Sequence, residues 1–365
     1  MPPAARLSRR GALASGFAVL AGCVTGSTGG GDARTPDSPD ARLGFVGDVM
    51  LGRGVNQRHR DGPPAAVWGD LTPVLEDLDG VFANLECSLS TRGERTPNRG
   101  YYFRADPAWA IPALEAANVA WVGLANNHVL DFGELALTDT VEALRGAAIP
   151  TSGAGETRSA AFAPANVDVG GLDVAVLAVT DRAPAYAAGA VQPGTAYVPM
   201  VGDPLTRYAL SAAIEEARSA GPDLLVVSLH WGPNWVTVPA ERYRRLAHWL
   251  VEAGADVVHG HSAHVPQGIE VYRGRPILHD CGDFVDDYAL VGDLHNDRSV
   301  WFDLAVSNGR PTTLRLHPVE IEAAAVHRSG GDAADWVRQA MRTRSAAFGT
   351  DLRREGDALA CDLRR

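Results

Sequence analysis

Short runs of apolar residues, each followed by an abrupt change to polar residues, recur along this chain. They have the length of β-strands, and they lack the alternation expected of a strand with one solvent-facing side, so they read as strands buried on both faces. The runs lie at residues 43–47, 81–83, 119–124, 223–229 and 256–258. Between them, apolar residues recur at helical spacing, as in Leu71, Val74, Leu75 and Leu78. Alternating strands and helices of this kind predict an α/β fold.

The same pattern predicts the remaining elements. Helices are expected at 70–78, 107–117, 134–147, 205–219, 240–253 and 332–348. Turn residues predict two hairpins, one joining 162–169 to 172–179 and one joining 269–272 to 276–278. Two late antiparallel strands are expected at 300–306 and 313–321, a long loop at 181–203, and a frayed tail after residue 348.

The first residues read as a targeting segment. Arg9 and Arg10 form a twin-arginine signature, and the apolar run after them is too short to remain as a membrane-spanning helix. The run ends in Leu-Ala-Gly followed by Cys23, which resembles the lipobox of bacterial lipoproteins, where the cysteine is lipidated after cleavage. We therefore expect a lipid anchor at Cys23 that holds the protein at the extracytoplasmic face of the cell membrane.

Length and composition indicate how the rest of the chain is organised. Its 365 residues are 46% hydrophobic and 21% charged, so a packed core is expected. The expected organisation is a signal at 1–23, a flexible tether rich in Gly, Ser, Thr, Pro and Asp at 24–41, a main domain at 42–325, and a C-terminal helix and tail at 326–365. The net charge of −11 argues against a general nucleic-acid binder, which would present a basic face.

Polar side chains follow each of the five predicted strands. In chain order they are Asp48, Glu86, Asn127, His230, and His261 with His264. Ligands of open α/β sheets bind just beyond the carboxyl ends of the strands, so these side chains should lie close together. Carboxylate, amide and imidazole groups suit divalent cations such as Mn, Fe or Zn, and two such ions can clamp the attacking and leaving oxygens of a phosphoryl displacement. The sequence therefore predicts a site for divalent metal ions, two in number, held by these six residues, with Glu86 as the bridging carboxylate.

His128 directly follows the candidate ligand Asn127. We expect it to act on substrate, by donating a proton to the leaving oxygen or by stabilising charge on the phosphoryl group. Asp131 would then orient His128 or cap a helix.

An arginine-rich loop at 91–104 could cover the site and bind anions. Arg104, which follows Tyr-Tyr-Phe, is the candidate for substrate binding there, together with Arg53 after the first strand. Arg92, Arg95 and Arg99 read as solvated surface residues.

Three cysteines remain after the signal: Cys87, Cys281 and Cys361. Cys87 and Cys281 follow strand-like runs near the predicted site, so they could meet. Two small buried thiols are the equally weighted alternative.

The order of these motifs resembles the calcineurin-like metallophosphoesterases, and more closely their CapA branch, the poly-γ-glutamate capsule biosynthesis proteins. The stretches that carry the resemblance are Gly-Asp at 47–48, Asn-x-Glu at 84–86, Asn-His at 127–128, His-Trp-Gly at 230–232 and Gly-His-x-x-His at 260–264. The resemblance implies a four-layer α/β/β/α sandwich on the outer face of the membrane. It also implies a role, beside other capsule-synthesis proteins, in making, exporting or anchoring an anionic polymer of glutamate.

Several positions depart from the metallophosphoesterase pattern. Met50 stands where the Asp-x-His motif has its histidine, and Glu86 stands where the bridging residue is usually aspartate. The last histidine pair is spaced by two residues, so either His261 or Ser262 could face the metal. Asp283, where the CapA branch often has asparagine, could replace the lost ligand or contact substrate.

Two classes of function therefore remain open. One is a metal-dependent hydrolase acting on a phosphoester or an amide-linked polymer. The other is a non-catalytic scaffold that binds the polymer through a degenerate metal site. The metal ligands and His128 favour the first class, and the missing imidazole at Met50 favours the second.

Overall fold

The computed structural model of the protein describes residues 39–199 and 204–364. The predicted twin-arginine segment, Cys23 and nearly all of the tether lie outside these residues. Across the described residues, no helix combines the length and the apolar character that a membrane crossing requires.

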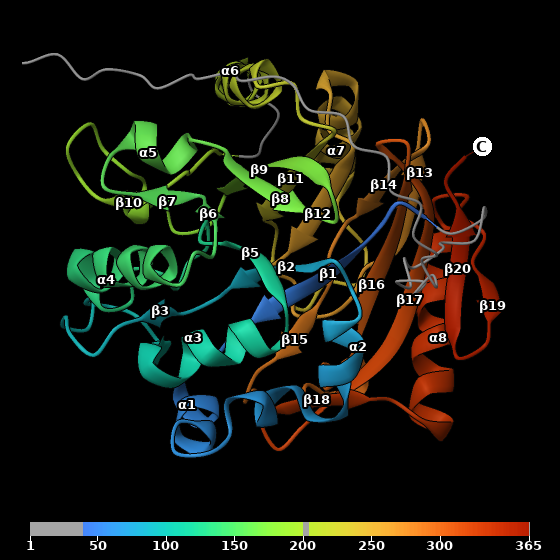
Figure 1. Ribbon diagram of the computed structural model, residues 1–365, viewed down its shortest axis with the longest axis horizontal. Helices are drawn as coiled ribbons and strands as arrows, with labels where there is room; N and C mark the ends of the chain where they lie inside the picture. The colour runs from blue at the N-terminus through green and yellow to red at the C-terminus, as the bar shows by residue number, and fades with distance from the viewer. Residues whose placement is uncertain (1–38, 200–203, 365) are drawn as a thin grey trace, which may run out of the picture. The chain divides into compact units, whose positions relative to one another are not determined.

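The larger of two main sheets has the strand order β19-β20-β17-β16-β1-β2-β5-β6, with β15 added beside β1 and β18 beside β17 (Figure 1). Its parallel part comprises β1 (Ala41–Val49), β2 (Gly80–Leu85), β5 (Val119–Gly123), β6 (Thr151–Ser152) and β15 (Asp283–Val285). Its antiparallel part comprises β16 (Arg298–Ser307), β17 (Arg310–Glu322), β18 (Ala325–Arg328), β19 (Arg353–Glu355) and β20 (Ala358–Asp362).

The second main sheet has the order β13-β14-β12-β11-β9-β8. Its strands are β8 (Ala165–Val169), β9 (Leu172–Thr180), β11 (Leu224–His230), β12 (Val257–His261), β13 (Ile269–Tyr272) and β14 (Arg275–Leu278). The pairs β8–β9 and β13–β14 are antiparallel, which confirms both predicted hairpins. Two short pairs lie apart, β3 (Ser88–Leu89) with β4 (Arg104–Ala105), and β7 (Ala154–Gly155) with β10 (Gly194–Thr195).

Helices cover the outer faces of both sheets (Figure 1). Those beside the larger sheet are α1 (Arg53–His59), α2 (Thr72–Glu76), α3 (Pro107–Ala116) and α4 (Gly133–Gly146). Those beside the second sheet are α5 (Arg158–Phe162), α6 (Pro204–Ser219) and α7 (Glu241–Ala253), and α8 (Gly331–Ala346) follows the antiparallel strands. Short 3₁₀ turns are η1 (Pro64–Leu71), η2 (Pro184–Tyr186) and η3 (Gly292–Leu294).

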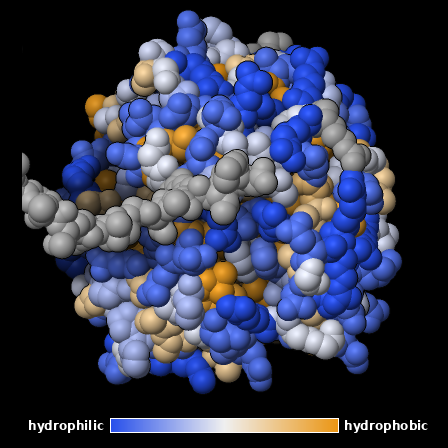
Figure 2. Space-filling view, turned by 45° about the vertical axis from the view of Figure 1, so that its right-hand side comes forward, coloured by the Kyte–Doolittle hydropathy of each residue, from blue (hydrophilic) through white to orange (hydrophobic). Residues whose placement is uncertain are grey.

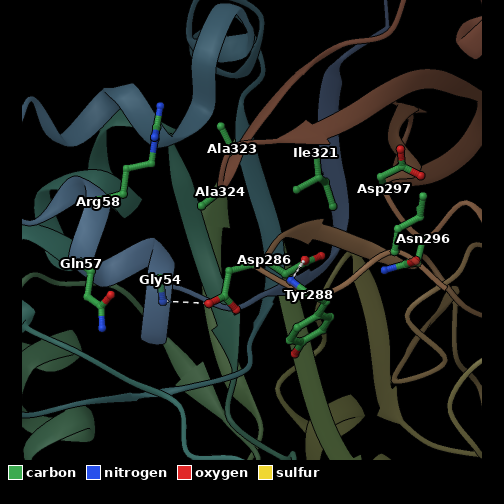
Figure 3. Close-up of a pocket in the computed structure, with 12 residues that line it drawn as sticks. Gly54, Gln57, Arg58, Asp286, Tyr288, Asn296, Asp297, Ile321, Ala323 and Ala324 are labelled. Atoms are coloured by element: carbon green, nitrogen blue, oxygen red, sulfur yellow. Dashed lines mark hydrogen bonds between the residues drawn. The ribbon is translucent and has the colours of Figure 1, made fainter.

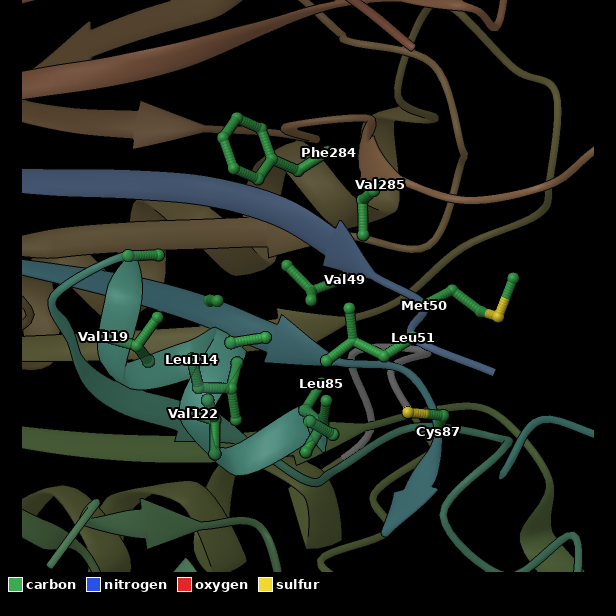
Figure 4. Close-up of a cluster of buried hydrophobic side chains, with 14 of the residues drawn as sticks. Val49, Met50, Leu51, Leu85, Cys87, Leu114, Val119, Val122, Phe284 and Val285 are labelled. Carbon is green, nitrogen blue, oxygen red and sulfur yellow. The ribbon is translucent and has the colours of Figure 1, made fainter. Parts of the chain in front are cut away.

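Neighbouring residues in a strand point into different cores. In β1, Phe45 packs between the two sheets, whereas Val46 packs in the core beneath α3 and α4, part of which Figure 4 shows. In β11, Val226 packs between the sheets and Val227 packs with α6 and α7. Both faces of these strands are covered, which is why they read as continuous apolar runs. The order helix, sheet, sheet, helix confirms the four-layer α/β/β/α sandwich.

Three sequence expectations are wrong. The strand expected to begin at residue 162 begins only at Ala165, because Phe162 is the last residue of α5. The helix expected at 70–78 is a 3₁₀ turn followed by the short α2, and η1 is kinked at Gly69. The tail is not frayed, because β20 pairs with β17 and buries Leu359 and Cys361 against the inter-sheet core.

The face shown in Figure 2 is mostly hydrophilic, with hydrophobic side chains in small scattered patches. This distribution is expected, because many of the apolar residues of the chain are buried in the three cores.

Candidate metal centre

The predicted strand ends meet at one edge of the sandwich. In the larger sheet, β1 pairs with β2 and β15 so that Asp48 lies beside Asn84 and Asp283. In the second sheet, His230 ends β11 directly beside His261 at the end of β12. A Cβ atom added at Gly47 would lie 1.7 Å from the carbonyl oxygen of Gly282. Only glycine at position 47 therefore lets β1 approach the turn before β15 this closely.

Asp48, His230 and His261 form a first buried group of potential metal ligands. The two imidazole Nδ1 atoms lie 2.9 Å apart. Asp48 Oδ1 lies 3.7 Å from Nδ1 of His230 and 3.5 Å from Nδ1 of His261. The other ring nitrogen of His230, Nε2, lies 2.7 Å from Oδ1 of Asn127. At the position left open by the sequence, the side chain of His261 joins the group, whereas Ser262 contributes its backbone N–H to Asp48.

A second buried group consists of Asp48, Glu86, His264 and Asp283. His264 Nδ1 lies 2.8 Å from Oδ1 of Asp283, 3.4 Å from Oδ2 of Asp48 and 4.0 Å from Oε2 of Glu86. Asp48 thus faces both groups with its two oxygens. Glu86 also turns its Oε1 toward the first group, 3.6 Å from Nε2 of His230. The geometry places Asp283 among the potential ligands, and Asp48 belongs to both groups.

One oxygen of this centre, Oε1 of Glu86, is buried without a hydrogen-bond partner among the described residues. Among the described residues, no arginine side chain donates a hydrogen bond to Asp48, Glu86 or Asp283. Buried carboxylates that lack a compensating donor or cation are costly. Carboxylate oxygen and imidazole nitrogen are ligands that Mn, Fe and Zn accept together. The residues present therefore fit divalent metal ions.

The pKa values in the centre differ from group to group. Burial acts against protonation of His264, but the charges of Asp283 and Glu86 outweigh it and raise that pKa well above its usual value. Burial, reinforced by the charge of Asp48, raises the pKa of Glu86 well above its usual value. Burial also acts against ionisation of Asp48, but hydrogen bonds from His230 and His264 outweigh it and hold that pKa well below its usual range. Burial lowers the pKa of His230 and of His261, which keeps both imidazoles in the neutral form that binds metals.

The turn that carries the histidine pair is strained. Ser262 and His264 have φ angles of 108° and 59°, a region that residues other than glycine rarely adopt. This turn brings the side chains of His261 and His264 into adjacent groups. Such strain concentrates at functional sites, where surrounding contacts hold it in place.

His128 lies beside the centre, and contacts with Asp131 and Phe103 fix its imidazole ring. Its Nδ1 is 2.7 Å from Oδ2 of the fully buried Asp131, and the ring of Phe103 stacks on the imidazole with centroids 3.7 Å apart. Of the two roles considered for Asp131, the structure shows the orientation of His128. Burial, opposed by Asp131, lowers the pKa of His128 to about 4. At neutral pH the ring is therefore uncharged, with its proton on Nδ1 toward Asp131 and a lone pair on Nε2.

A cavity of about 360 Å³ opens at this edge and is bounded by both His128 and His264. The rest of its wall includes Arg53 and a set of aromatic side chains: Tyr101, Phe103, Trp235 and Tyr288. The Arg53 guanidinium pairs with Asp287 at 3.0 Å. The predicted placement of Arg53 beside the site thus agrees with the structure.

The other arginines are arranged differently from the sequence expectation. Arg104 does not line the cavity; its guanidinium donates to the carbonyl oxygen of Arg92 and lies over the ring of Phe132. Arg99, expected to be solvated, instead pairs with Asp131 at 3.1 Å and donates to the backbone of Asn127. The buried carboxylate of Asp131 requires a cationic partner, and that requirement cannot be read from the loop sequence alone.

Some contributors were missed by sequence reasoning. Asn84 donates to Oδ1 of Asp48 at 2.7 Å, and its position two residues before Glu86 was the available signal. Asn126 accepts hydrogen bonds from the backbone N–H groups of His128 and Val129 and so fixes that turn. Tyr288 donates to Glu86 from a loop that carried no signal. The three cysteines among the described residues are free, and Cys87 and Cys281 lie in different cores.

Sequence comparisons with known proteins agree on one family. The family described as bacterial capsule synthesis protein PGA_cap matches residues 42–288. A Mycobacterium tuberculosis protein named probable polyglutamine synthesis accessory protein is 35% identical, over 87% of this chain and 94% of its own length. Capsule biosynthesis protein CapA of Bacillus anthracis is 31% identical over 67% of this chain and 59% of its own. Among solved structures, a protein of Thermus thermophilus has a TM-score of 0.42 and 12% identity, covering 77% of this chain and 98% of its own.

Proposed function

The chain belongs to the bacterial capsule synthesis protein PGA_cap family, and from this premise we propose that it acts in the biosynthesis or export of a poly-γ-glutamate capsule as a metal-dependent hydrolase. The substrate would be a phosphoester or the amide-linked anionic polymer itself. Partners in this role would be that polymer and other capsule-synthesis proteins.

One observation carries the hydrolase proposal. The centre gathers carboxylates and imidazoles in two adjacent groups, and the buried Oε1 of Glu86 lacks a hydrogen-bond partner among the described residues. A protein without a bound cation would gain from replacing such carboxylates by apolar residues. Their presence beside an open cavity supports a centre built for divalent ions rather than for stability.

Asp48, Glu86, Asn127, His230, His261, His264 and Asp283 would hold the ions. When bound, the ions would supply Lewis-acid activation of a phosphoryl or carbonyl oxygen. His128 would take up a proton at Nε2 from solvent water and donate it to the leaving oxygen, while Asp131 holds the opposite nitrogen and fixes the tautomer. Arg53 would hold an anionic group of the substrate against the cavity wall.

The division between ligand and proton carrier is testable with two variants of the purified protein. His128→Ala should retain the bound metal and lose on the order of a hundredfold in hydrolysis rate, because only the proton carrier is removed. His230→Ala should lose metal, because His230 lies in the first group of ligands. Metal content by elemental analysis and hydrolysis of a generic phosphodiester are the measurements. Loss of metal from His128→Ala would contradict the assigned roles.

A non-catalytic scaffold is the alternative, and one observation favours it. Met50, at the position of the missing histidine, is fully buried in the core beneath α3 and α4. Its sulfur accepts a hydrogen bond from the backbone N–H of Gly52. That position supplies no metal ligand. A wild-type protein that binds metal but hydrolyses neither phosphoesters nor γ-glutamyl polymer would establish the scaffold role.

We also propose that the protein is anchored to the extracytoplasmic face of the cell membrane through lipid at Cys23. The twin-arginine pair, the short apolar run and the lipobox-like residues support this location. Cys23→Ser should move the protein from the membrane fraction to the soluble fraction. An unchanged distribution on cell fractionation would refute the anchor.

A further inference from the structure

Tyr288 lies in the loop that follows β15, and hydrogen bonds fix the backbone of this loop. Its backbone N–H donates to Oδ1 of Asp286 at 2.6 Å, and the neighbouring Asp287 accepts from the backbone N–H of Gly54 at 2.8 Å (Figure 3). Asp287 also pairs with Arg53. These contacts fix the position from which the Tyr288 side chain enters the site.

The Tyr288 ring lies between two cavities. It lines the 360 Å³ cavity beside the metal centre and also a larger one of about 640 Å³, shown in Figure 3, on the side of Gly54 and Asp286. The ring meets His264 edge-on, with centroids 5.2 Å apart at 84°, and packs near Phe103 at 5.8 Å. Its orientation is therefore set by packing, independently of the hydroxyl group.

The hydroxyl group makes one contact with the candidate ligands. It donates to Oε2 of Glu86 at 3.1 Å. Oε1 of the same carboxylate has no hydrogen-bond partner and lies 3.6 Å from Nε2 of His230. The phenol therefore holds one oxygen of Glu86 and leaves the other turned toward the first group of ligands.

Resting on the proposed metal centre, we propose that Tyr288 is a positioning residue that fixes the rotation of the Glu86 carboxylate, so that its two oxygens face the two groups of ligands. The terminal torsion of glutamate is broad, so packing alone does not set it. A carboxylate oxygen has two lone-pair sites, so Oε2 can accept from the phenol and still bind a cation. Partners of this kind commonly contribute about 10- to 100-fold to metal affinity.

The test is Mn²⁺ titration of the purified full-length protein, followed by calorimetry and by electron paramagnetic resonance of the bound ion. Tyr288→Phe keeps the ring and removes only the hydroxyl, so the fold should persist and Mn²⁺ affinity should fall about tenfold. Tyr186→Phe is the matched control. Its hydroxyl lies 3.5 Å from Asp131 and makes no hydrogen bond to the candidate ligands, so wild-type Mn²⁺ affinity is expected.

A double-mutant cycle with Glu86→Gln separates positioning from general packing. If Tyr288 acts through Glu86, adding Tyr288→Phe to Glu86→Gln should cause no further loss of Mn²⁺ affinity. Equal losses in both backgrounds would overturn the proposal, as would wild-type affinity in Tyr288→Phe alone. A wild-type protein that binds no Mn²⁺, Fe²⁺ or Zn²⁺ would instead overturn the metal centre itself, and this inference with it.

Discussion

Two clusters in this protein both combine carboxylates with histidines and differ in how their charge is balanced. The Asp48 cluster comprises the carboxylates and imidazoles of the metal centre: Asp48, Glu86, His230, His261, His264 and Asp283. The Glu270 cluster lies beneath α7 and comprises Glu270, Arg244, His248 and His279.

In the Glu270 cluster the chain supplies every partner of the carboxylate. Oε1 of Glu270 lies 2.9 Å from Nη2 of Arg244 and 2.8 Å from Nε2 of His248. Oε2 lies 3.0 Å from Nε2 of His279. Burial opposes ionisation, but the hydrogen bonds from His279, Arg244 and His248 outweigh it and lower the pKa of Glu270 to about 2. Both oxygens of Glu270 thus have partners within the chain, without any external ion.

In the Asp48 cluster one carboxylate oxygen, Oε1 of Glu86, has no hydrogen-bond partner among the described residues, and burial raises the pKa of Glu86 well above its usual value. The difference shows that a buried group of Asp, Glu and His does not by itself indicate a metal site. The informative features are a buried oxygen left without a donor and the absence of an arginine partner among the described residues, because those leave a place that an external cation can fill.

The strongest test of this comparison applies the same substitution to both clusters. Glu86→Gln should lower divalent-metal affinity by about a hundredfold or more, since a ligand contributes at least as much as the partners that support it. The metal-free variant should be as stable as wild type or more stable, because burial and Asp48 disfavour a charge on Glu86 and the amide carries none. Mn²⁺ titration and urea unfolding of the metal-free protein measure the two effects. Marked destabilisation without metal would mean that the Asp48 cluster is a structural network like its counterpart.

Much of the Asp48 cluster could be predicted because its residues follow strands. An apolar run identifies a buried strand, and the carboxyl ends of parallel strands share an edge, so Asp48 had to approach Glu86 in one sheet and His230 had to approach His261 in the other. The sandwich adds a second sheet whose strand ends face those of the first, and this arrangement came from the motif resemblance rather than from periodicity.

The rest depends on contacts that no local pattern encodes. Arg99 reaches Asp131 across 32 residues of chain and Tyr288 reaches Glu86 across 202, so their loops resemble ordinary surface segments in the sequence. The charged residues of the tail predict fraying, yet alternate residues such as Leu359 and Cys361 face the core and β20 completes the sheet. The Glu270 cluster was missed because its members lie on three separate elements.

The second and smaller expected effect is a loss of stability in Glu270→Gln. The amide keeps the shape of the side chain but loses the charge that Arg244 and His248 share, so the free energy of unfolding should fall by about 2 kcal/mol. Metal content and hydrolysis should remain as in wild type, because none of these residues touches the Asp48 cluster. Urea unfolding at pH 7 measures the loss of stability. A loss of bound metal in Glu270→Gln would show that the two clusters are coupled.

The pH dependence of that loss tests whether charge is its cause. In the folded protein the pKa of Glu270 is about 2, below its usual value of 4.5, so the folded state favours the ionised carboxylate. The stabilisation is therefore fully present above pH 4.5 and is lost as the pH falls through 4.5 toward 2, where folded Glu270 takes up a proton. The difference in unfolding free energy between wild type and Glu270→Gln should stay at its full value from pH 7 to pH 5 and shrink at pH 4 and pH 3. Other carboxylates titrate equally in both proteins, so their contributions cancel in the difference. A difference that stays constant down to pH 3 would assign the loss to altered hydrogen-bond geometry, and the contrast between a charge-balanced cluster and one awaiting a cation would lose its electrostatic basis.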